Sequence, residues 1–396
     1  MNYKKKQRIT HKQHKPHKPH KPHKPHKYKS RHKSHNTKSH NTKSKTIKYC
    51  CPDLKNKSQC SKLHTNTSNT NNTNNTTNKY AIFTLLFGND SYLPGIMLLG
   101  SSINKVMPNL DSKLYKNFDL CCMITHEITK DARETILKVY DRIIEVDYLQ
   151  IPPNLISHSH DDENIKNIYS KTFTKLRIFE YKEYDKILFL DADMLVIKDD
   201  IFTLFDLKTP ACIFMGKISN DLRNRYYKQD NTQMAKFQNK YCNWKGKQLH
   251  GNLIPYSKTD NEKASQGMNI ETSVLLITPN SKIVLQRDKY LDTIRKNNIK
   301  IKGDTEMISL MFKDKLYAIE PRFFGRWRNP DENPELVVLD LYGTQGKPWD
   351  ILKLHKLKTW VDVEYWWRFY IKTYKSIYIN YHNNTLDALY AGIMEL

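Results

Sequence analysis

The chain has 396 residues and a formal net charge of +24, which is unevenly distributed. Residues 1–79 contain 21 Lys and Arg and one acid, Asp53, so this segment carries +20 of the total and leaves about +4 for the rest. No apolar stretch is long enough to span a bilayer or to form the core of a signal peptide, and the odd number of cysteines, seven, argues against a disulfide framework. We therefore expect a cytoplasmic protein in a reducing compartment.

Residues 1–79 are predicted to be a disordered basic tail, because they have too little apolar surface to offset the entropy of ordering. His-Lys-Pro repeats from His14 to Lys27 have a period of three, which matches a polyproline II helix and would place Lys along one ridge. We favour a solvated tether for this tail. The alternative is salt-sensitive binding to polyanions. The Asn/Thr-rich tract 66–78 is predicted to be a linker to the folded part.

From Tyr80 onward, segments typical of strands and helices alternate. Strands are predicted over 81–87, 118–124, 142–146, 187–190 and 272–278, and helices over 92–106, 130–140, 172–181, 281–296, 307–312 and 360–381. This βαβ series predicts an α/β domain over 80–396, with a mostly parallel sheet and helices on both faces. Residues 217–265 are polar and lack a clear period, so we expect a functional insertion there. The Trp- and Tyr-rich final helix is expected to pack into the core rather than to bind sugars.

Two carboxylates separated by one residue follow the apolar run 187–190, namely Asp191 and Asp193. This run reads as a buried strand, so both carboxylates are expected at the carboxyl edge of the sheet, where open α/β sheets bind ligands. Two neighbouring carboxylates are unfavourable unless a cation neutralises them, and hard oxygen ligands favour magnesium or manganese shared with a phosphate. The pair therefore predicts a metal that holds a diphosphate.

Other interpretations of this Asp-Ala-Asp segment stay open at this point. It is compatible with a simple turn or a helix cap. It also resembles the motif of aspartate-nucleophile phosphatases, which is an apolar strand ending in Asp-x-Asp. That family has Thr or Val where this chain has Leu195, and its motif lies near the start of the domain, whereas a whole strand and helix precede Asp191 here.

Four sequence blocks in a fixed order resemble glycosyltransferase family 8, the retaining glycosyltransferases of the glycogenin and galactinol synthase type. The resemblance runs from about Tyr80 to Ile351, without the insertion. The blocks are Thr84-Leu85 with Asn89-Asp90-Ser91-Tyr92 and Leu98-Leu99-Gly100-Ser101-Ser102, then Thr174-Lys175-Leu176, then Phe189-Leu190-Asp191-Ala192-Asp193, and last Gly346-Lys347-Pro348-Trp349.

The resemblance implies a nucleotide-diphosphosugar transferase (GT-A) fold with a Rossmann-like mixed sheet. It implies transfer of a hexose, glucose or a related sugar, from a UDP-sugar to a hydroxyl acceptor with retention of anomeric configuration. Mn²⁺ would be the cofactor, with Mg²⁺ as the alternative. The acceptor would be a glycan, a protein or a small polyol, and a homodimer is among the expected assemblies.

The resemblance also assigns roles to individual residues. Asp191, Asp193 and Asp340 would be the metal ligands, and Asp304 the catalytic candidate, as a stabiliser or hydroxyl anchor of the transferred sugar. The full set expected to contact the donor is Leu85, Asn89, Tyr92, Lys175, Asp191, Ala192, Asp193, Thr272, Asp304, Gly343 and Lys347.

Three departures from the family pattern bear on these roles. Asp340 stands where the family has a His ligand, if one extra residue lies between Gly343 and Lys347. An extra residue precedes Asn89. Glu271-Thr272-Ser273 replaces an Asn-Ser-Gly or Asn-Ala-Gly segment that contacts the donor. Two further hypotheses therefore stand beside the transferase, the Asp-x-Asp phosphatase and an inactive scaffold whose tail binds polyanions.

Overall fold

The computed structural model describes residues 79–109, 118–157, 162–214, 249–254, 270–326, 328–341, 346–350 and 361–380. Nearly all of the predicted tail and most of the predicted insertion at 217–265 lie outside the described residues. The domain limits at 79 and 80 and the role of the tail therefore stay predictions.

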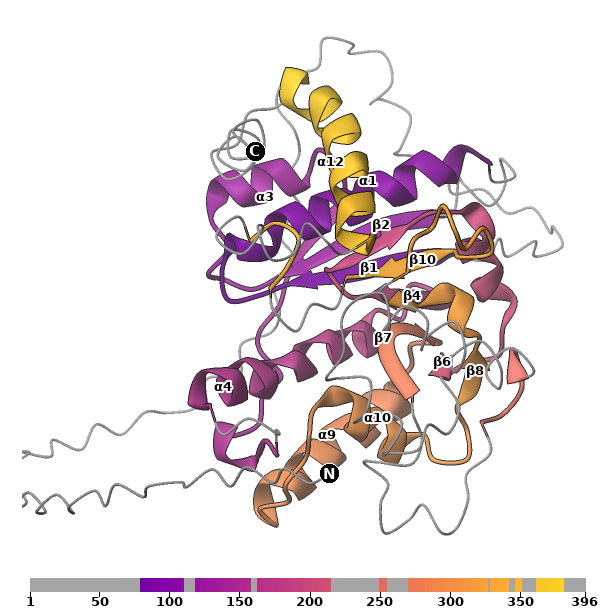
Figure 1. Cartoon of the computed structure of the whole chain (residues 1–396). Coiled ribbons are helices and arrows are strands. Elements are labelled where there is room, and N and C mark those ends of the chain that lie inside the picture. The colour runs from indigo at the N-terminus through magenta and orange to yellow at the C-terminus, as the bar shows by residue number, and fades with distance from the viewer. Residues whose placement is uncertain are drawn as a thin grey trace, which may run out of the picture. The chain divides into compact units, whose positions relative to one another are not determined.

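A seven-stranded sheet forms the centre of the fold, in the order β3-β2-β1-β4-β7-β6-β8 (Figure 1). Strands β3, β2, β1 and β4 are parallel, β7 is antiparallel to both of its neighbours, and β8 is parallel to β6. The mixed, mostly parallel sheet expected from the sequence is therefore confirmed. Its strands are β1 (Tyr80–Leu86), β2 (Phe118–Ile124), β3 (Arg142–Glu145), β4 (Lys186–Leu190), β6 (Ala211–Phe214), β7 (Ile270–Ile277) and β8 (Tyr317–Ile319).

Helices cover both faces of this sheet, as predicted (Figure 1). One face carries α1 (Leu93–Val106), α3 (Lys130–Ile136) and α12 (Val361–Asn380), and the other carries α4 (Glu163–Lys171), α9 (Ser281–Lys296) and α10 (Asp304–Met311). Alternate residues of β1 supply the two cores, with Ile82 and Leu86 on the first face and Phe83 and Leu85 on the second. A strand buried on both faces reads as a continuous apolar run, which explains the run in the sequence.

Short 3₁₀ helices connect several elements. They are η1 (Asp90–Tyr92), η2 (Met107–Asn109), η3 (Pro153–Leu155), η4 (Thr172–Glu180), η5 (Asp199–Asp206) and η7 (Pro321–Phe323). The predicted helix over 172–181 is thus a 3₁₀ segment, and the sequence analysis missed α4 directly before it. The signal for α4 was Asp162, whose side chain accepts a hydrogen bond from the backbone of Asn164 and caps the helix.

A second, three-stranded sheet was not predicted. It has the order β5-β10-β9, with β5 (Met194–Val196), β10 (Val338–Asp340) and β9 (Gly325–Arg326). Strand β5 begins directly after Asp193, so the Asp-Ala-Asp segment is a turn that joins the two sheets and is not the cap of a helix. Strands of two or three residues carry too short an alternation to be recognised in a sequence.

The aromatic C-terminal helix packs into the core, as expected. Trp366 and Tyr370 of α12 are fully buried, and Trp366 contacts Trp349 with a ring centroid distance of 5.6 Å. Within the segments that the structure describes, no helix combines the length and the apolar character needed to cross a membrane.

Candidate active site

The turn that carries Asp191 and Asp193 is held by backbone hydrogen bonds on both sides. The amide of Asp191 donates to the carbonyl of Ser273 in β7 at 3.0 Å, and the amide of Leu341, next to β10, donates to the carbonyl of Asp193 at 3.0 Å. The two sheets therefore fix the turn at the carboxyl end of β4, where the sequence analysis placed it.

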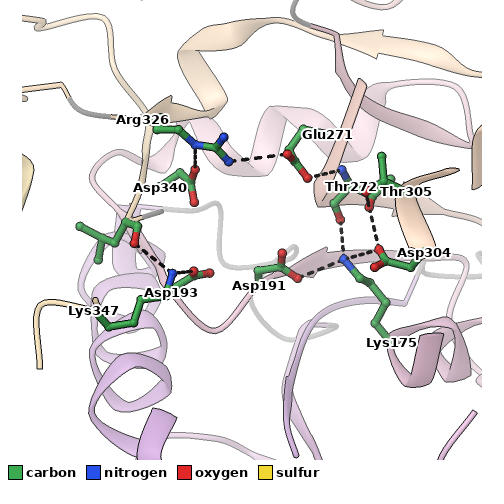
Figure 2. A network of polar contacts seen from close by, with 11 residues as sticks. Lys175, Asp191, Asp193, Glu271, Thr272, Asp304, Thr305, Arg326, Asp340 and Lys347 are labelled. Carbon is green, nitrogen blue, oxygen red and sulfur yellow. Dashed lines mark hydrogen bonds and ion pairs between the residues drawn. The ribbon is translucent and has the colours of Figure 1, made fainter. Parts of the chain in front are cut away.

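Lys175 of η4 lies between two carboxylates on one side of this turn (Figure 2). Its Nζ is 3.2 Å from Oδ1 of Asp191 and 2.8 Å from Oδ2 of Asp304, and its side chain is only 7% exposed. Burial disfavours the ammonium, but the two carboxylates outweigh it and raise the pKa of Lys175 above its ordinary value. Lys175 is therefore charged at neutral pH.

Asp304 is the first residue of α10, after the N-cap Gly303. The hydroxyl of Thr272 in β7 donates to Oδ2 of Asp304 at 2.9 Å, and it lies 2.7 Å from the hydroxyl of Thr305. The same carboxylate oxygen thus contacts both Lys175 and Thr272, which fixes its position. Thr272 and Asp304, both predicted donor residues, come together although 32 positions separate them.

Lys347 lies on the other side of the turn and is hydrogen-bonded to the carboxylate of Asp193 (Figure 2). Its Nζ also donates to the carbonyl of Leu341 at 3.2 Å. Burial opposes the charge on Asp193, but the ammonium of Lys347 holds the pKa of Asp193 below its usual range. The ring of Tyr92 lies 5.9 Å from Lys347 Nζ and meets Trp349 edge-on at 5.3 Å. These contacts place the predicted Tyr92 in the same site.

Arg326 is a site residue that the sequence analysis missed. Its Nε donates to Oδ2 of Asp340 at 2.6 Å, and its terminal nitrogen lies 3.6 Å from Oε2 of Glu271. Arg326 belongs to the two-residue strand β9, and 14 and 55 positions separate it from its two partners. No local pattern in the sequence could have brought these residues together.

Burial raises the pKa of two carboxylates of the site, Asp191 and Asp340. Asp191 has a pKa of about 7, mainly because it is desolvated, with the negative charges of Asp193, Asp304 and Glu271 adding to the effect against the opposing charge of Lys175. Burial likewise raises the pKa of Asp340 to about 6 in spite of Arg326. A cation that joined the site would therefore be attracted to these groups.

The charges of the network allow a test of whether a metal fits. Five carboxylates, those of Asp191, Asp193, Glu271, Asp304 and Asp340, face three cations, those of Lys175, Arg326 and Lys347 (Figure 2). When all are ionised, two negative charges remain, which a divalent cation would balance. Among the described residues, however, no three His, Cys, Asp or Glu side chains are grouped closely enough to hold a metal ion. The fit is therefore to a cation bound by Asp191 and Asp193, with oxygens of a ligand completing the coordination.

The remaining predicted donor residues lie around this network or outside the description. Leu85 is buried near the end of β1, and Ala192 lies between the two aspartates. Oδ1 of Asn89 accepts a hydrogen bond from the amide of Ser91 at 2.9 Å and caps η1. Gly343 lies outside the described residues. The donor-binding roles of all eleven predicted residues, these four included, stay predictions.

Part of the chain is similar to a known protein family and to several known proteins. Residues 83–246 match the family model described as glycosyl transferase family 8. An uncharacterized protein of Acanthamoeba polyphaga mimivirus, R707, is 30% identical over 132 residues, which are 33% of this chain and 42% of that protein. Glycogenin-1 of Saccharomyces cerevisiae (strain YJM789) is 27% identical over 136 residues, covering 33% of this chain and 22% of glycogenin-1. Galactinol synthase 4 of Arabidopsis thaliana is 28% identical over 127 residues, 32% of this chain and 34% of the synthase.

The matched segments thus span less than half the length of these relatives. Similar solved structures include the galactosyltransferase LgtC in complex with donor and acceptor sugar analogs, with a TM-score of 0.45, 16% identity and coverage of 74% of this chain and 95% of LgtC. The glycosyltransferase GlyE of Streptococcus pneumoniae TIGR4 has a TM-score of 0.41, 16% identity and coverage of 74% and 60%. The family match over residues 83–246 confirms the resemblance to glycosyltransferase family 8 that the sequence blocks indicated.

Proposed function

We propose that this chain, which resembles glycosyltransferase family 8 over residues 83–246, is a retaining hexosyltransferase that moves a hexose from a UDP-sugar to a hydroxyl acceptor. The observation that carries the proposal is the turn of Asp191 and Asp193 with a lysine bound to each carboxylate. Lys175 and Lys347 come from segments far apart in the sequence, yet both reach this turn. Alternating carboxylates and ammonium groups suit a ligand that is itself a metal cation paired with a diphosphate.

The metal would be held by Asp191 and Asp193, and Mn²⁺ is the proposed ion with Mg²⁺ as the alternative. Asp340, the third predicted ligand, accepts a hydrogen bond from Arg326 at 2.6 Å and is not grouped closely enough with the two aspartates to share an ion with them. When bound, this ion would supply positive charge next to the departing diphosphate. The oxygens of Asp191 and Asp193 are hard ligands, which both ions accept.

The residues of this chain then have separate tasks. Lys347 would release Asp193 to the metal and face the diphosphate, whose negative charge grows as the bond to the sugar breaks. Lys175, held by Asp191 and Asp304, would face the diphosphate from the other side of the turn. Asp304 would stabilise the positively charged sugar or bind one of its hydroxyls, and the hydroxyl of Thr272 keeps its carboxylate in place. Removing one such preorganised charge typically costs about 3 to 4 kcal/mol in barrier height.

The proposal also covers the acceptor, the cellular compartment, the assembly and the basic tail. The acceptor would be a glycan, a protein or a small polyol, the protein would act in the cytoplasm, and a homodimer is a proposed assembly. The basic segment 1–79 would be a tether or a polyanion-binding tail attached to a transferase domain over 80–396. The family match favours a transferase over an Asp-x-Asp phosphatase.

Thermal unfolding with a panel of UDP-sugars, each with Mn²⁺ or with EDTA, tests the function. Any ligand that prefers the native state raises the melting temperature, so we expect a rise with at least one UDP-sugar that requires the metal. Product analysis with the stabilising donor should then show transfer or hydrolysis. No stabilisation by UDP or any UDP-sugar would contradict the proposal, and phosphoenzyme formation at Asp191 would support the phosphatase instead. Stabilisation without any turnover would favour an inactive scaffold.

A further inference from the structure

Arg326 is the third cation of the network, next to Lys175 and Lys347, and it contacts Asp340 and Glu271 (Figure 2). Its side chain is only 13% exposed, which is low for an arginine, and such a charge is stable only when it is paired. Asp340 and Glu271 supply that pairing. Burial opposes the charge of Asp193, but the ammonium of Lys347 lowers the pKa of Asp193, and the positive charge of Arg326 lowers it further by a smaller amount. The guanidinium of Arg326 is therefore close enough to the carboxylate of Asp193 to act on its charge, without a direct contact between them.

The small sheet fixes Arg326 in this position. Arg326 and Asp340 are paired neighbours on the parallel strands β9 and β10, so their side chains share one side of the sheet. The guanidinium also lies 4.7 Å above the ring of Phe324. The preceding Gly325 packs so tightly that an added Cβ would lie 2.2 Å from a methyl group of Leu336. Arg326 thus has little freedom to move away from the turn.

We propose that Arg326 binds the diphosphate of the donor and that Asp340 and Glu271 position its guanidinium for this contact. The inference rests on the proposed function. A diphosphate seated on a metal at Asp191 and Asp193 presents several anionic oxygens, and the two lysines approach them from only two directions. A guanidinium is planar and has five N–H donors, so its Nε can pair with Asp340 and one terminal nitrogen can stay near Glu271 while N–H groups of the terminal nitrogens also meet phosphate oxygens. A lysine has no such geometry.

The competing explanation is that Arg326 only neutralises the buried Asp340. The two explanations differ in how removal of the positive charge of Arg326 changes the affinities for UDP and for Mn²⁺. Arg326→Gln should weaken UDP binding if the guanidinium contacts the diphosphate. The same change removes a positive charge near the carboxylates, so it should strengthen the binding of Mn²⁺ alone. General damage to the fold would weaken both.

The experiment measures the affinity of full-length protein for Mn²⁺ alone by electron paramagnetic resonance and for UDP in saturating Mn²⁺ by calorimetry. For Arg326→Gln we expect about 10- to 100-fold weaker UDP binding, which corresponds to loss of one hydrogen bond to a charged group, and Mn²⁺ binding tighter by roughly 3-fold or more. Arg326→Lys should fall between this variant and the unchanged protein for UDP, because it keeps the charge without the fork.

Arg322 provides a matched control four residues away. It is also paired with two carboxylates, Asp200 at 2.8 Å and Glu320 at 2.6 Å, and it also lies over a phenylalanine ring. Arg322→Gln should leave both affinities unchanged. Equal UDP affinity of Arg326→Gln and the unchanged protein would overturn the inference, as would parallel weakening of both ligands. If the unchanged protein binds Mn²⁺ but no UDP, the proposed function itself fails.

Discussion

The ammonium of Lys175 lies 2.8 Å from the carboxylate of Asp304, and both side chains are almost fully buried. Lys175 also contacts Asp191 at 3.2 Å, so one cation serves two carboxylates. Removing the cation and removing one anion should therefore have unequal consequences, because only the first change leaves two carboxylates, the buried Asp304 and the 34% exposed Asp191, without their cation.

Lys175→Met is expected to lower the free energy of unfolding by about 3 to 5 kcal/mol, the typical result of breaking a buried ion pair. Asp304→Asn should lower it less, since Lys175 keeps Asp191. Urea unfolding at neutral pH without metal measures both. Lys130→Met is the control, because Lys130 pairs with Glu134 at the surface, at 3.7 Å and with its side chain 87% exposed, and exposed pairs contribute about 0 to 1 kcal/mol. A Lys175→Met variant as stable as the control would show that the pair is not important for stability.

Asp193→Ala is expected to abolish metal-dependent stabilisation by UDP and to reduce transfer by roughly two to three decades. The change removes a proposed metal ligand and also the partner of Lys347. Thermal unfolding with UDP and Mn²⁺, together with a transfer assay, measures the effect. Asp292→Ala changes an exposed carboxylate paired only with Arg295 within the described helix α9, so it should behave like the unchanged protein. Retained UDP affinity in Asp193→Ala would remove this residue from the site.

Gly95→Ala is expected to destabilise the protein by about 1 to 3 kcal/mol, the usual range for overpacking. A Cβ at Gly95 would lie 2.6 Å from the carbonyl oxygen of Ala192 and 2.6 Å from the indole of Trp349. Because Ala192 lies between the two aspartates, UDP affinity should fall as well. At Gly303 the nearest atom to an added Cβ is 3.6 Å away, an ordinary contact, so Gly303→Ala is the matched comparison. Chemical denaturation measures the free energy of unfolding of both variants. Equal values would show that a Cβ at Gly95 is tolerated as well as one at Gly303.

The metal-free protein should lose stability as the pH rises from about 4 to about 7. Asp191 and Asp340 have pKa values of about 7 and about 6 in the folded state, above the ordinary value of 3.8. The folded state therefore holds protons in this range that the unfolded chain has released, so rising pH favours unfolding. Asp191→Asn removes one of these groups and should make the decline shallower. Urea unfolding in EDTA between pH 4 and 7 measures the free energy of unfolding of both proteins. If this free energy falls equally steeply with pH in Asp191→Asn and in the unchanged protein, Asp191 does not cause the decline.

Strand β4, which ends at the two aspartates, was predictable because it is an apolar run buried between two helical layers. The end of β4 at Leu190 fixed the place of Asp191 and Asp193 without knowledge of the other strands. Helix limits were less accurate. The helix expected over 130–140 ends at Ile136, and the one expected from 307 begins at Asp304, because Gly303 is its N-cap.

The second sheet and the role of Arg326 were beyond sequence reasoning. Strand β9 has only two residues, Gly325 and Arg326, and its pairing with β10 is a tertiary contact. Lys175 and Lys347 were found because a family motif surrounds each of them. Arg326 has no such motif, and its importance follows only from its distance to Asp340. Glu271, noted only as a departure from the family pattern, is the other partner of this arginine.

The turn that links β4 to β5 makes the site depend on long-range order. One strand of that link belongs to the large sheet and the other to the small one, so neither sheet alone would bring Asp191, Asp193 and Asp340 together. A partly unfolded species that kept the seven strands but lost the three would carry every acidic side chain and still recognise no nucleotide. The proposed nucleotide binding would thus require both sheets to be folded, and a bound nucleotide would stabilise the three-stranded sheet.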